Sequence, residues 1–217
     1  MKRKMNSIVL SGLLLAAFGV VGASLLVVTQ YQTRDKIAAN YRMALMHQLM
    51  EVLGDNQHDN DFLEDKVTLA GEGFHSSQAV RVYRVRSQGK PVAAVFVTTT
   101  PKGYAGSIQV IVALRMDRSI SGVRVVRHHE TPGLGDKMEL AKSDWILRFT
   151  GASLQQPKQS KWAVKKDGGD FDQFTGATIT PRAIVNAVRD VLLWAQVDKQ
   201  FESVFVLPSD VSGTKHE

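Results

Sequence analysis

The clearest strand signal in this chain is Ser107-Ile108-Gln109-Val110-Ile111-Val112-Ala113-Leu114-Arg115-Met116. Successive side chains of a strand point to opposite faces, and this stretch divides accordingly. One face carries Ile108, Val110, Val112, Leu114 and Met116, and the other carries Gln109, Ile111, Ala113 and Arg115. Three further segments rich in Val, Ile and Thr predict strands at residues 79–85, 92–99 and 120–127.

Short connectors separate the predicted strands. Ser87-Gln88-Gly89-Lys90 and Asp117-Arg118-Ser119 have the lengths of hairpin turns, whereas a parallel crossover needs about a dozen residues. We therefore expect a meandering antiparallel sheet. A helix is expected after Thr180-Pro181, because Thr caps helices and Pro is favoured at the first helical position. Strands followed by a helix predict an α+β fold.

Two apolar stripes with helical spacing flank the predicted sheet. The stripe after Pro181 consists of Ile184, Val188, Val191, Leu192 and Ala195, and it gives that helix one face to pack on the sheet. The stripe before the sheet ends at Gly54, a residue type common after helices. It consists of Ile37, Tyr41, Ala44, Leu45, Gln48, Leu49 and Val52.

An uncharged stretch of 21 residues runs from Ile8 to Val28. As a helix it would span roughly 31 Å, which matches the hydrocarbon core of a bilayer. A cleaved signal peptide is the alternative, since Val21-Gly22-Ala23 offers small residues, but the apolar part of a signal is usually about 7–15 residues. We therefore expect an uncleaved single-pass anchor.

The charges around this stretch predict its orientation. Lys2, Arg3 and Lys4 precede it, whereas residues 30–36 have a mixed balance, so the N-terminus should be cytoplasmic. The soluble domain would then be periplasmic at a bacterial inner membrane. We expect the anchor in residues 1–29, one soluble domain in residues 30–206 and a flexible tail in residues 207–217.

Small residues recur along one face of the predicted anchor, at Gly12, Ala16, Gly19 and Ala23. Such a seam lets helices approach closely within lipid, which would indicate partner subunits in the membrane. Gly and Ala are also simply common in membrane helices, so both interpretations stay open.

Composition excludes several function classes. The chain has no Cys, which rules out disulfides, iron–sulfur ligation and a cysteine nucleophile. The net charge is +6, and Lys2-Arg3-Lys4 supplies three of those charges, so the remainder is too mild to indicate nucleic-acid binding. Familiar catalytic motifs are missing, and the adjacent His128 and His129 would point to opposite faces of a strand, so we predict neither catalytic residues nor a metal site.

Two stretches suit a ligand better than packing. In residues 130–137, Pro132 restricts the backbone and two glycines permit close approach of a flat group, although an ordinary loop is the alternative. In residues 172–181, small and hydroxylated residues precede a helix, where exposed amides make an anion site. A phosphate on Thr178 would lie about two residues ahead of the capping Thr180, but a plain helix cap would have the same sequence pattern.

A family resemblance gives these stretches a specific interpretation. Asp172-x-x-Thr175-Gly176-Ala177-Thr178 resembles the signature of proteins modified by a flavin transferase, and Thr178 falls on the acceptor threonine. Residues 103–108, Gly-Tyr-Ala-Gly-Ser-Ile, and residues 130–135, Glu-Thr-Pro-Gly-Leu-Gly, resemble two further motifs of the same FMN-binding domain. Over nearly its whole length the chain is similar to the G subunit of Rnf-type electron transport complexes, with the C subunit of sodium-pumping NADH:quinone reductases as a relative.

The resemblance implies a covalent flavoprotein. FMN would be joined through a phosphoester to Thr178 by a separate magnesium-dependent flavin transferase that uses FAD as donor. The chain would carry electrons within a ferredoxin- and NAD-linked, ion-translocating membrane complex, with the other subunits as partners, and would not act as a stand-alone enzyme.

The remaining roles also follow from the resemblance. Asp172 would serve transferase recognition, Thr175 occupies a place that is often Ser, and Gly176 and Ala177 would keep the site slim, although a plain tight turn is the alternative. Tyr104 would lie near the flavin or in the core. The isoalloxazine would be bordered by Glu130, Thr131, Gly133, Leu134 and Gly135.

Two other functions remain open on sequence alone. One is a flavinylated subunit of a sodium-pumping quinone reductase-like complex. The other is a membrane-tethered binding or scaffolding module without a cofactor, which colour and fluorescence would distinguish.

Overall fold

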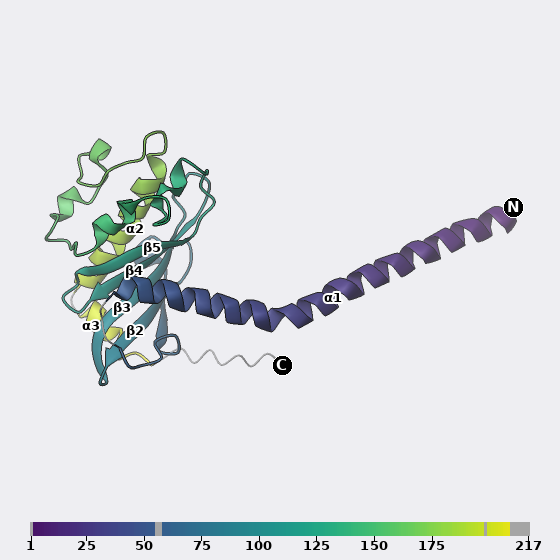
Figure 1. Ribbon diagram of the computed structural model, residues 1–217, viewed down its shortest axis with the longest axis horizontal. Coiled ribbons are helices and arrows are strands. Elements are labelled where there is room, and N and C mark those ends of the chain that lie inside the picture. The colour runs from purple at the N-terminus through teal and green to yellow at the C-terminus, as the bar shows by residue number, and fades with distance from the viewer. Residues whose placement is uncertain (1, 55–57, 198, 209–217) are drawn as a thin grey trace. The chain divides into compact units, whose positions relative to one another are not determined.

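The computed structural model describes residues 2–54, 58–197 and 199–208. The chain divides into a helical N-terminal part that ends at Met46 and a folded domain that begins at His47. The order of elements along the chain is visible in Figure 1.

The N-terminal helix α1 runs without interruption from Lys2 to Leu53. The predicted anchor and the predicted helix after it are therefore one element, because residues 30–36 contain neither Pro nor Gly to end it. Gly54, with φ of 58°, follows its last turn as expected. Among the described residues, the part of α1 from Leu10 to Leu53 is the one candidate, by length and composition, for a helix that crosses a membrane.

The sheet has five antiparallel strands in the order β1-β2-β3-β4-β5 (Figure 1). This confirms the α+β fold, the meander and four of the strands, while the first strand was missed because four residues show too little alternation. Met116 was assigned to the third predicted strand but lies just past its end. The bounds are β1 Lys66–Leu69, β2 Val80–Ser87, β3 Lys90–Thr100, β4 Ile108–Arg115 and β5 Ile120–Arg127.

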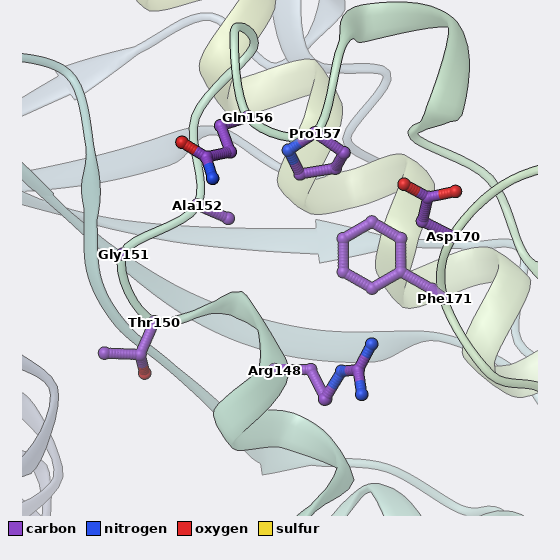
Figure 2. A pocket seen from close by; sticks show the side chains of 8 residues that line it. All are labelled: Arg148, Thr150, Gly151, Ala152, Gln156, Pro157, Asp170 and Phe171. Carbon is purple, nitrogen blue, oxygen red and sulfur yellow. The ribbon is translucent and has the colours of Figure 1, made fainter.

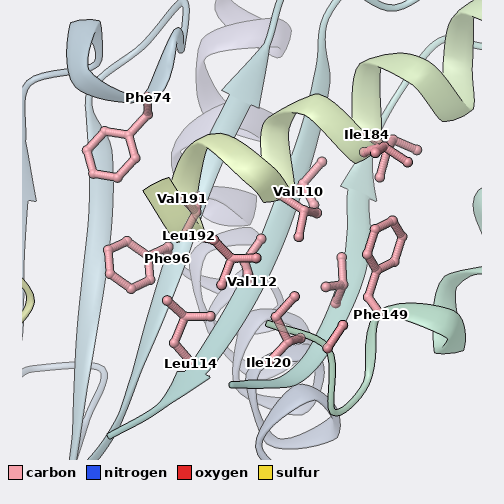
Figure 3. Packing of buried hydrophobic residues seen from close by; sticks show 14 of the residues in the cluster. Phe74, Phe96, Val110, Val112, Leu114, Ile120, Phe149, Ile184, Val191 and Leu192 are labelled. Atoms are coloured by element: carbon pink, nitrogen blue, oxygen red, sulfur yellow. The ribbon is translucent and has the colours of Figure 1, made fainter. Parts of the chain in front are cut away.

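Helix α2 (Ile179–Gln196) packs its apolar stripe on one face of this sheet, as predicted. Figure 3 shows Ile184, Val191 and Leu192 of α2 facing Val110 and other side chains of the strands. Four short helices add buried residues to the same core, namely η1 (Glu72–Phe74), η2 (Gly135–Met138), η3 (Asp144–Phe149) and α3 (Gln200–Ser203). Two more, η4 (Gln159–Lys161) and η5 (Lys165–Asp167), have no buried residues of their own.

The other face of the sheet is covered by the last turns of α1. Ser121 Oγ donates to the carbonyl oxygen of Leu53 at 2.9 Å, and Arg124 Nε lies 3.1 Å from Glu51 Oε2. A Cβ on Gly122 would lie 2.7 Å from the carbonyl oxygen of Val52, so glycine is what allows this close approach. Leu49 and Val52 of the predicted stripe are buried, whereas Ile37 and Ala44 are exposed and the side chain of Tyr41 lies outside the described residues.

A Gly122→Ala substitution tests this contact. The added methyl group would meet main-chain atoms of Val52, which cannot rotate away, so we expect a loss of about 1–3 kcal/mol in unfolding free energy. Denaturant unfolding of the detergent-solubilised full chain measures it. Gly12→Ala is the control, because a Cβ at Gly12 meets nothing within 4 Å. Equal stability of the two variants would show that α1 does not pack closely on β5.

Two arginines of β2 hold the C-terminal end of the described chain. Arg84 Nη1 donates to the carbonyl oxygens of Val204, at 3.1 Å, and Leu207, and Arg86 Nη2 donates to that of Phe205 at 2.8 Å. Leu207 therefore belongs to the bonded part of the domain. Pro208 is described and exposed, and residues 209–217 of the predicted tail lie outside the described residues.

Candidate functional site

A cavity of about 210 Å³ lies where three loops of the domain meet. The first loop connects β3 to β4, the second follows β5, and the third leads into α2. These are the three segments whose motifs were singled out in the sequence. The lining residues are Tyr104, Glu130, Thr131, Leu134, Gly135, Gly176, Ala177, Thr178 and Ile179.

Glu130 joins the three loops. Its side chain is buried, its Oε1 accepts the backbone N–H of Ala105 at 3.1 Å, and its Oε2 accepts a hydrogen bond from the hydroxyl of Thr180. The sequence predicted that Glu130 borders the ligand. It lines the cavity, but each of its carboxylate oxygens already accepts a hydrogen bond, one from the loop between β3 and β4 and the other from the first turn of α2.

Two glycines make room for this carboxylate. A Cβ on Gly135 would lie 2.8 Å from Glu130 Oε2, and a Cβ on Gly103 would lie 2.8 Å from Glu130 Oε1. Both contacts are closer than packed atoms allow. Gly135 was predicted to permit close approach of a flat ligand, and in the structure it permits close approach of Glu130.

His128 fixes the backbone at Glu130. The N–H of Glu130 donates to His128 Nδ1 at 3.1 Å, and His128 Nε2 lies 2.9 Å from Glu139 Oε1. Because Nδ1 accepts a hydrogen bond, this geometry assigns the ring proton to Nε2, where it can be donated to Glu139. The sequence showed an adjacent pair of histidines but not this chain of contacts.

Thr178 is the residue that precedes the first turn of α2, and its side chain makes no capping hydrogen bond. The cap predicted at Thr180 was wrong, since Thr180 lies inside the first turn and gives its hydroxyl to Glu130. Pro181 is accordingly the third helical residue and not the first. The half-buried Thr178 therefore lies directly at the positive end of the helix, where the first backbone N–H groups have no partner within the helix.

A tight turn presents Thr178 to the cavity. The N–H of Ala177 donates to the carbonyl oxygen of Phe174 at 3.0 Å, and Gly176 has φ of 81°, a conformation that glycine adopts without strain. Leu134 faces this turn, because a Cβ on Gly176 would be 3.7 Å from its Cδ2. Gly176 thus forms the tight turn named as the alternative and also lines the cavity.

Three of the residues predicted for the site do not line the cavity. Asp172 points its carboxylate to Lys165 Nζ at 2.5 Å, and its carbonyl oxygen accepts Trp145 Nε1–H at 2.8 Å. Thr175 is exposed on the turn before Thr178. Gly133, with φ of 79°, shapes the loop that positions Leu134.

The charged residue one helical turn beyond Thr178 is already paired. Arg182 Nε and Nη2 lie 2.6 Å and 2.9 Å from the two carboxylate oxygens of Asp167. These hydrogen bonds lower the pKa of Asp167 and raise that of Arg182. An anion at Thr178 would therefore be bound mainly by backbone N–H groups.

A larger and more polar hollow of about 490 Å³ lies elsewhere in the domain, and no residue predicted for the site lines it. Figure 2 shows Arg148 and Asp170 among its lining residues. In the part of the chain that the structure describes, no group of three or more His, Asp or Glu residues could hold a metal ion.

The smaller cavity has the chemistry of a cofactor site. Leu134, Ala177 and the exposed Tyr104 and Ile179 offer apolar surface to a flat ring, while Thr178 and the start of α2 offer a hydroxyl and amides to a phosphate. Ile179 lies within residues 172–181, which the sequence singled out, but it was not named as a site residue because it falls just past the motif that ends at Thr178. The fold and this site are those of a domain suited to a phosphate-bearing aromatic cofactor, in a chain with one helix long and apolar enough to cross a membrane among its described residues.

Comparison with known proteins identifies that class. Residues 103–193 match the FMN-binding domain family, and residues 1–52 match the RnfG N-terminal region. Proteins described as the G subunit of an ion-translocating oxidoreductase complex are similar over most of their length. The one from Salmonella typhi is 45% identical over 190 residues, which cover 85% of this chain and 89% of the relative.

Two further relatives carry the same description. The protein from Pseudoalteromonas atlantica is 44% identical over 191 residues, covering 88% of this chain and 89% of the relative. The protein from Shewanella oneidensis is 41% identical over 213 residues, covering 98% and 99%. The chain belongs to the family of G subunits of ion-translocating oxidoreductase complexes, which confirms the resemblance seen in its motifs.

Proposed function

We propose that Thr178 carries FMN through a phosphoester and that the flavin relays electrons within the complex. The supporting observation is the position of the Thr178 side chain, free of a capping bond, at a cavity lined by all three motifs. An FMN-binding domain over residues 103–193 supports FMN as the cofactor. When bound, FMN supplies one- and two-electron redox chemistry.

Attachment requires a separate flavin transferase and FAD. In this reaction the Thr178 oxygen forms a bond to the FMN phosphorus of FAD, the hydroxyl proton is released, and AMP leaves. Asp172 and Thr175 lie on the exposed side of the same segment, where a transferase could reach them. The N–H groups at the start of α2 would then hold the phosphate, and Leu134, Ala177 and Ile179 would exclude water from the ring.

The mass of the intact chain tests this proposal. The full chain is coexpressed with a flavin transferase, purified in detergent, denatured and weighed. We expect one added FMN less one water, and no addition when the transferase is omitted. An unmodified mass in both samples would refute the covalent linkage.

We further propose that the domain lies on the periplasmic side of a bacterial inner membrane, tethered by α1 among the other subunits of the complex. Membership in a family of complex subunits and the apolar stretch of α1 support this arrangement. Lys2-Arg3-Lys4 before the stretch favours a cytoplasmic N-terminus.

A reporter fused after Glu217 tests the orientation. We expect alkaline phosphatase, which is active only outside the cytoplasm, to be active in this fusion. A fluorescent protein that matures only in the cytoplasm is the matched reporter and should stay dark. The reverse pattern would overturn the topology.

A further inference from the structure

Glu130 is a buried carboxylate in the wall of the cavity that would hold the flavin. It is 5% exposed, and both of its oxygens accept a hydrogen bond from a donor, the N–H of Ala105 and the hydroxyl of Thr180. Thr180 lies in the first turn of α2, so the positive end of that helix is close to the same carboxylate.

No basic side chain neutralises this charge within the described residues, since Glu130 forms no ion pair there. His128 contacts the backbone N–H of Glu130 and directs its other nitrogen to Glu139. Arg182 is held by Asp167, and Lys165 by Asp172. The carboxylate of Glu130 is therefore bound by two neutral donors, and no basic side chain among the described residues pairs with it.

We propose that Glu130 lowers the reduction potential of the flavin by placing a fixed negative charge beside it. Each electron that enters the flavin adds negative charge unless a proton follows, and a nearby carboxylate makes that addition less favourable. The inference rests on the proposed function, because it requires a flavin in this cavity. Glu130 positions the loops of the site through its hydrogen bonds. The proposed effect on the potential is a second role, which a neutral side chain of the same shape would not have.

Glu130→Gln removes the negative charge of the side chain and keeps its shape. The amide oxygen can accept the Ala105 N–H, and the amide nitrogen can donate to Thr180 Oγ, because a hydroxyl both donates and accepts. The measurement is electrode-mediated spectroscopic titration of the purified, flavinylated full chain. At a fixed potential we expect the ratio of reduced to oxidised flavin to rise at least about tenfold, or about 59 mV for a one-electron couple.

Glu202→Gln is the matched control. Its carboxylate pairs with Arg118 at 2.9 Å in the turn between β4 and β5, whereas Glu130 lies beyond the opposite end of β5. Eight strand residues span about 26 Å, more than twice the distance over which salt screens exposed charges. We expect the same potential as in the wild type. An equal shift in both variants would overturn the proposal, since net charge alone would then explain it.

Flavin content distinguishes this proposal from the proposed function. If the wild-type chain takes up no covalent flavin, the proposed function fails. If Glu130→Gln is flavinylated to the wild-type level and its potential is unchanged, the charge proposal fails while the function stands. Circular dichroism establishes that the variant is folded.

A second variant keeps the test decisive if Glu130→Gln does not fold or take up flavin. Tyr104→Lys places a positive charge at an exposed residue that lines the cavity and precedes Ala105. It should oppose the field of Glu130 and raise the potential without disturbing the core. An unchanged potential in a flavinylated Tyr104→Lys chain would overturn the proposal.

Discussion

Thr178→Ala is expected to abolish the flavin fluorescence that remains after denaturing electrophoresis, because among the residues that line the cavity only Thr178 offers a hydroxyl at the start of α2. Thr178 makes no capping hydrogen bond, so its replacement should change the unfolding free energy by no more than about 0.5 kcal/mol. Loss of flavin with unchanged stability would assign the effect to the missing oxygen. The measurement is in-gel fluorescence together with denaturant unfolding of the flavin-free chains.

Thr131→Ala is the matched control for this experiment. Thr131 lines the same cavity and is exposed, and its backbone carbonyl, which the substitution retains, accepts hydrogen bonds from Leu134 and Gly135. We expect this variant to keep its covalent flavin. Retained fluorescence in Thr178→Ala would mean that flavin is attached elsewhere or that the assignment of the acceptor is wrong.

Trp145→Ala is expected to lower the unfolding free energy strongly and to cause loss of flavinylation. Trp145 Nε1–H holds the carbonyl oxygen of Asp172 at 2.8 Å, and its ring lies 5.0 Å from that of Phe174, both within the segment that precedes Thr178. Truncation of a buried Trp costs about 3–5 kcal/mol. The segment also loses the two contacts that anchor it to η3, so most of the covalent flavin should be lost at temperatures where the domain is still folded.

Phe201→Ala separates the effect of Trp145→Ala on stability from its effect on flavin attachment. Phe201 is fully buried, its ring lies 6.4 Å from that of Phe96, and neither residue lines the cavity. Its removal should also cost about 3–5 kcal/mol while leaving flavin content intact. If Phe201→Ala loses as much flavin as Trp145→Ala, stability alone explains the loss. Trp145→Phe should cost about 1–3 kcal/mol, because it leaves the carbonyl of Asp172 without its donor.

The local parts of this fold could be predicted from sequence, because each depends on neighbouring residues. Alternation in residues 107–116 predicted β4, and short turns predicted antiparallel pairing. The stripe from Ile184 to Ala195 predicted the buried face of α2. The length of the uncharged stretch predicted a membrane-spanning segment, and the spacing of short motifs predicted the family.

Residues 135–174 could not be predicted in the same way. They contain four short 3-10 helices and no extended periodic pattern, yet Trp162, Phe149 and Phe171 from this region stack in the core at ring distances of 4.8 to 6.1 Å. Short helices of this kind have little intrinsic stability, so contacts with the rest of the core determine their positions.

The sequence by itself predicted four of the five strands, the helical regions of α1 and α2, and Thr178 as the candidate attachment residue, because periodicity and short motifs are properties of adjacent residues. Only the tertiary structure decided that Glu130 binds Thr180, 50 residues away, and that Gly103 and Gly135 give space to its carboxylate. Hydrogen-bonding capacity can be read from residue type, but the partner depends on which loops the folded sheet and α2 bring together. The tertiary structure likewise places Thr180 inside the first turn of α2 with its hydroxyl on Glu130, and Thr178 as the residue before the helix, because a hydroxyl that donates to a buried carboxylate does not cap the helix amides.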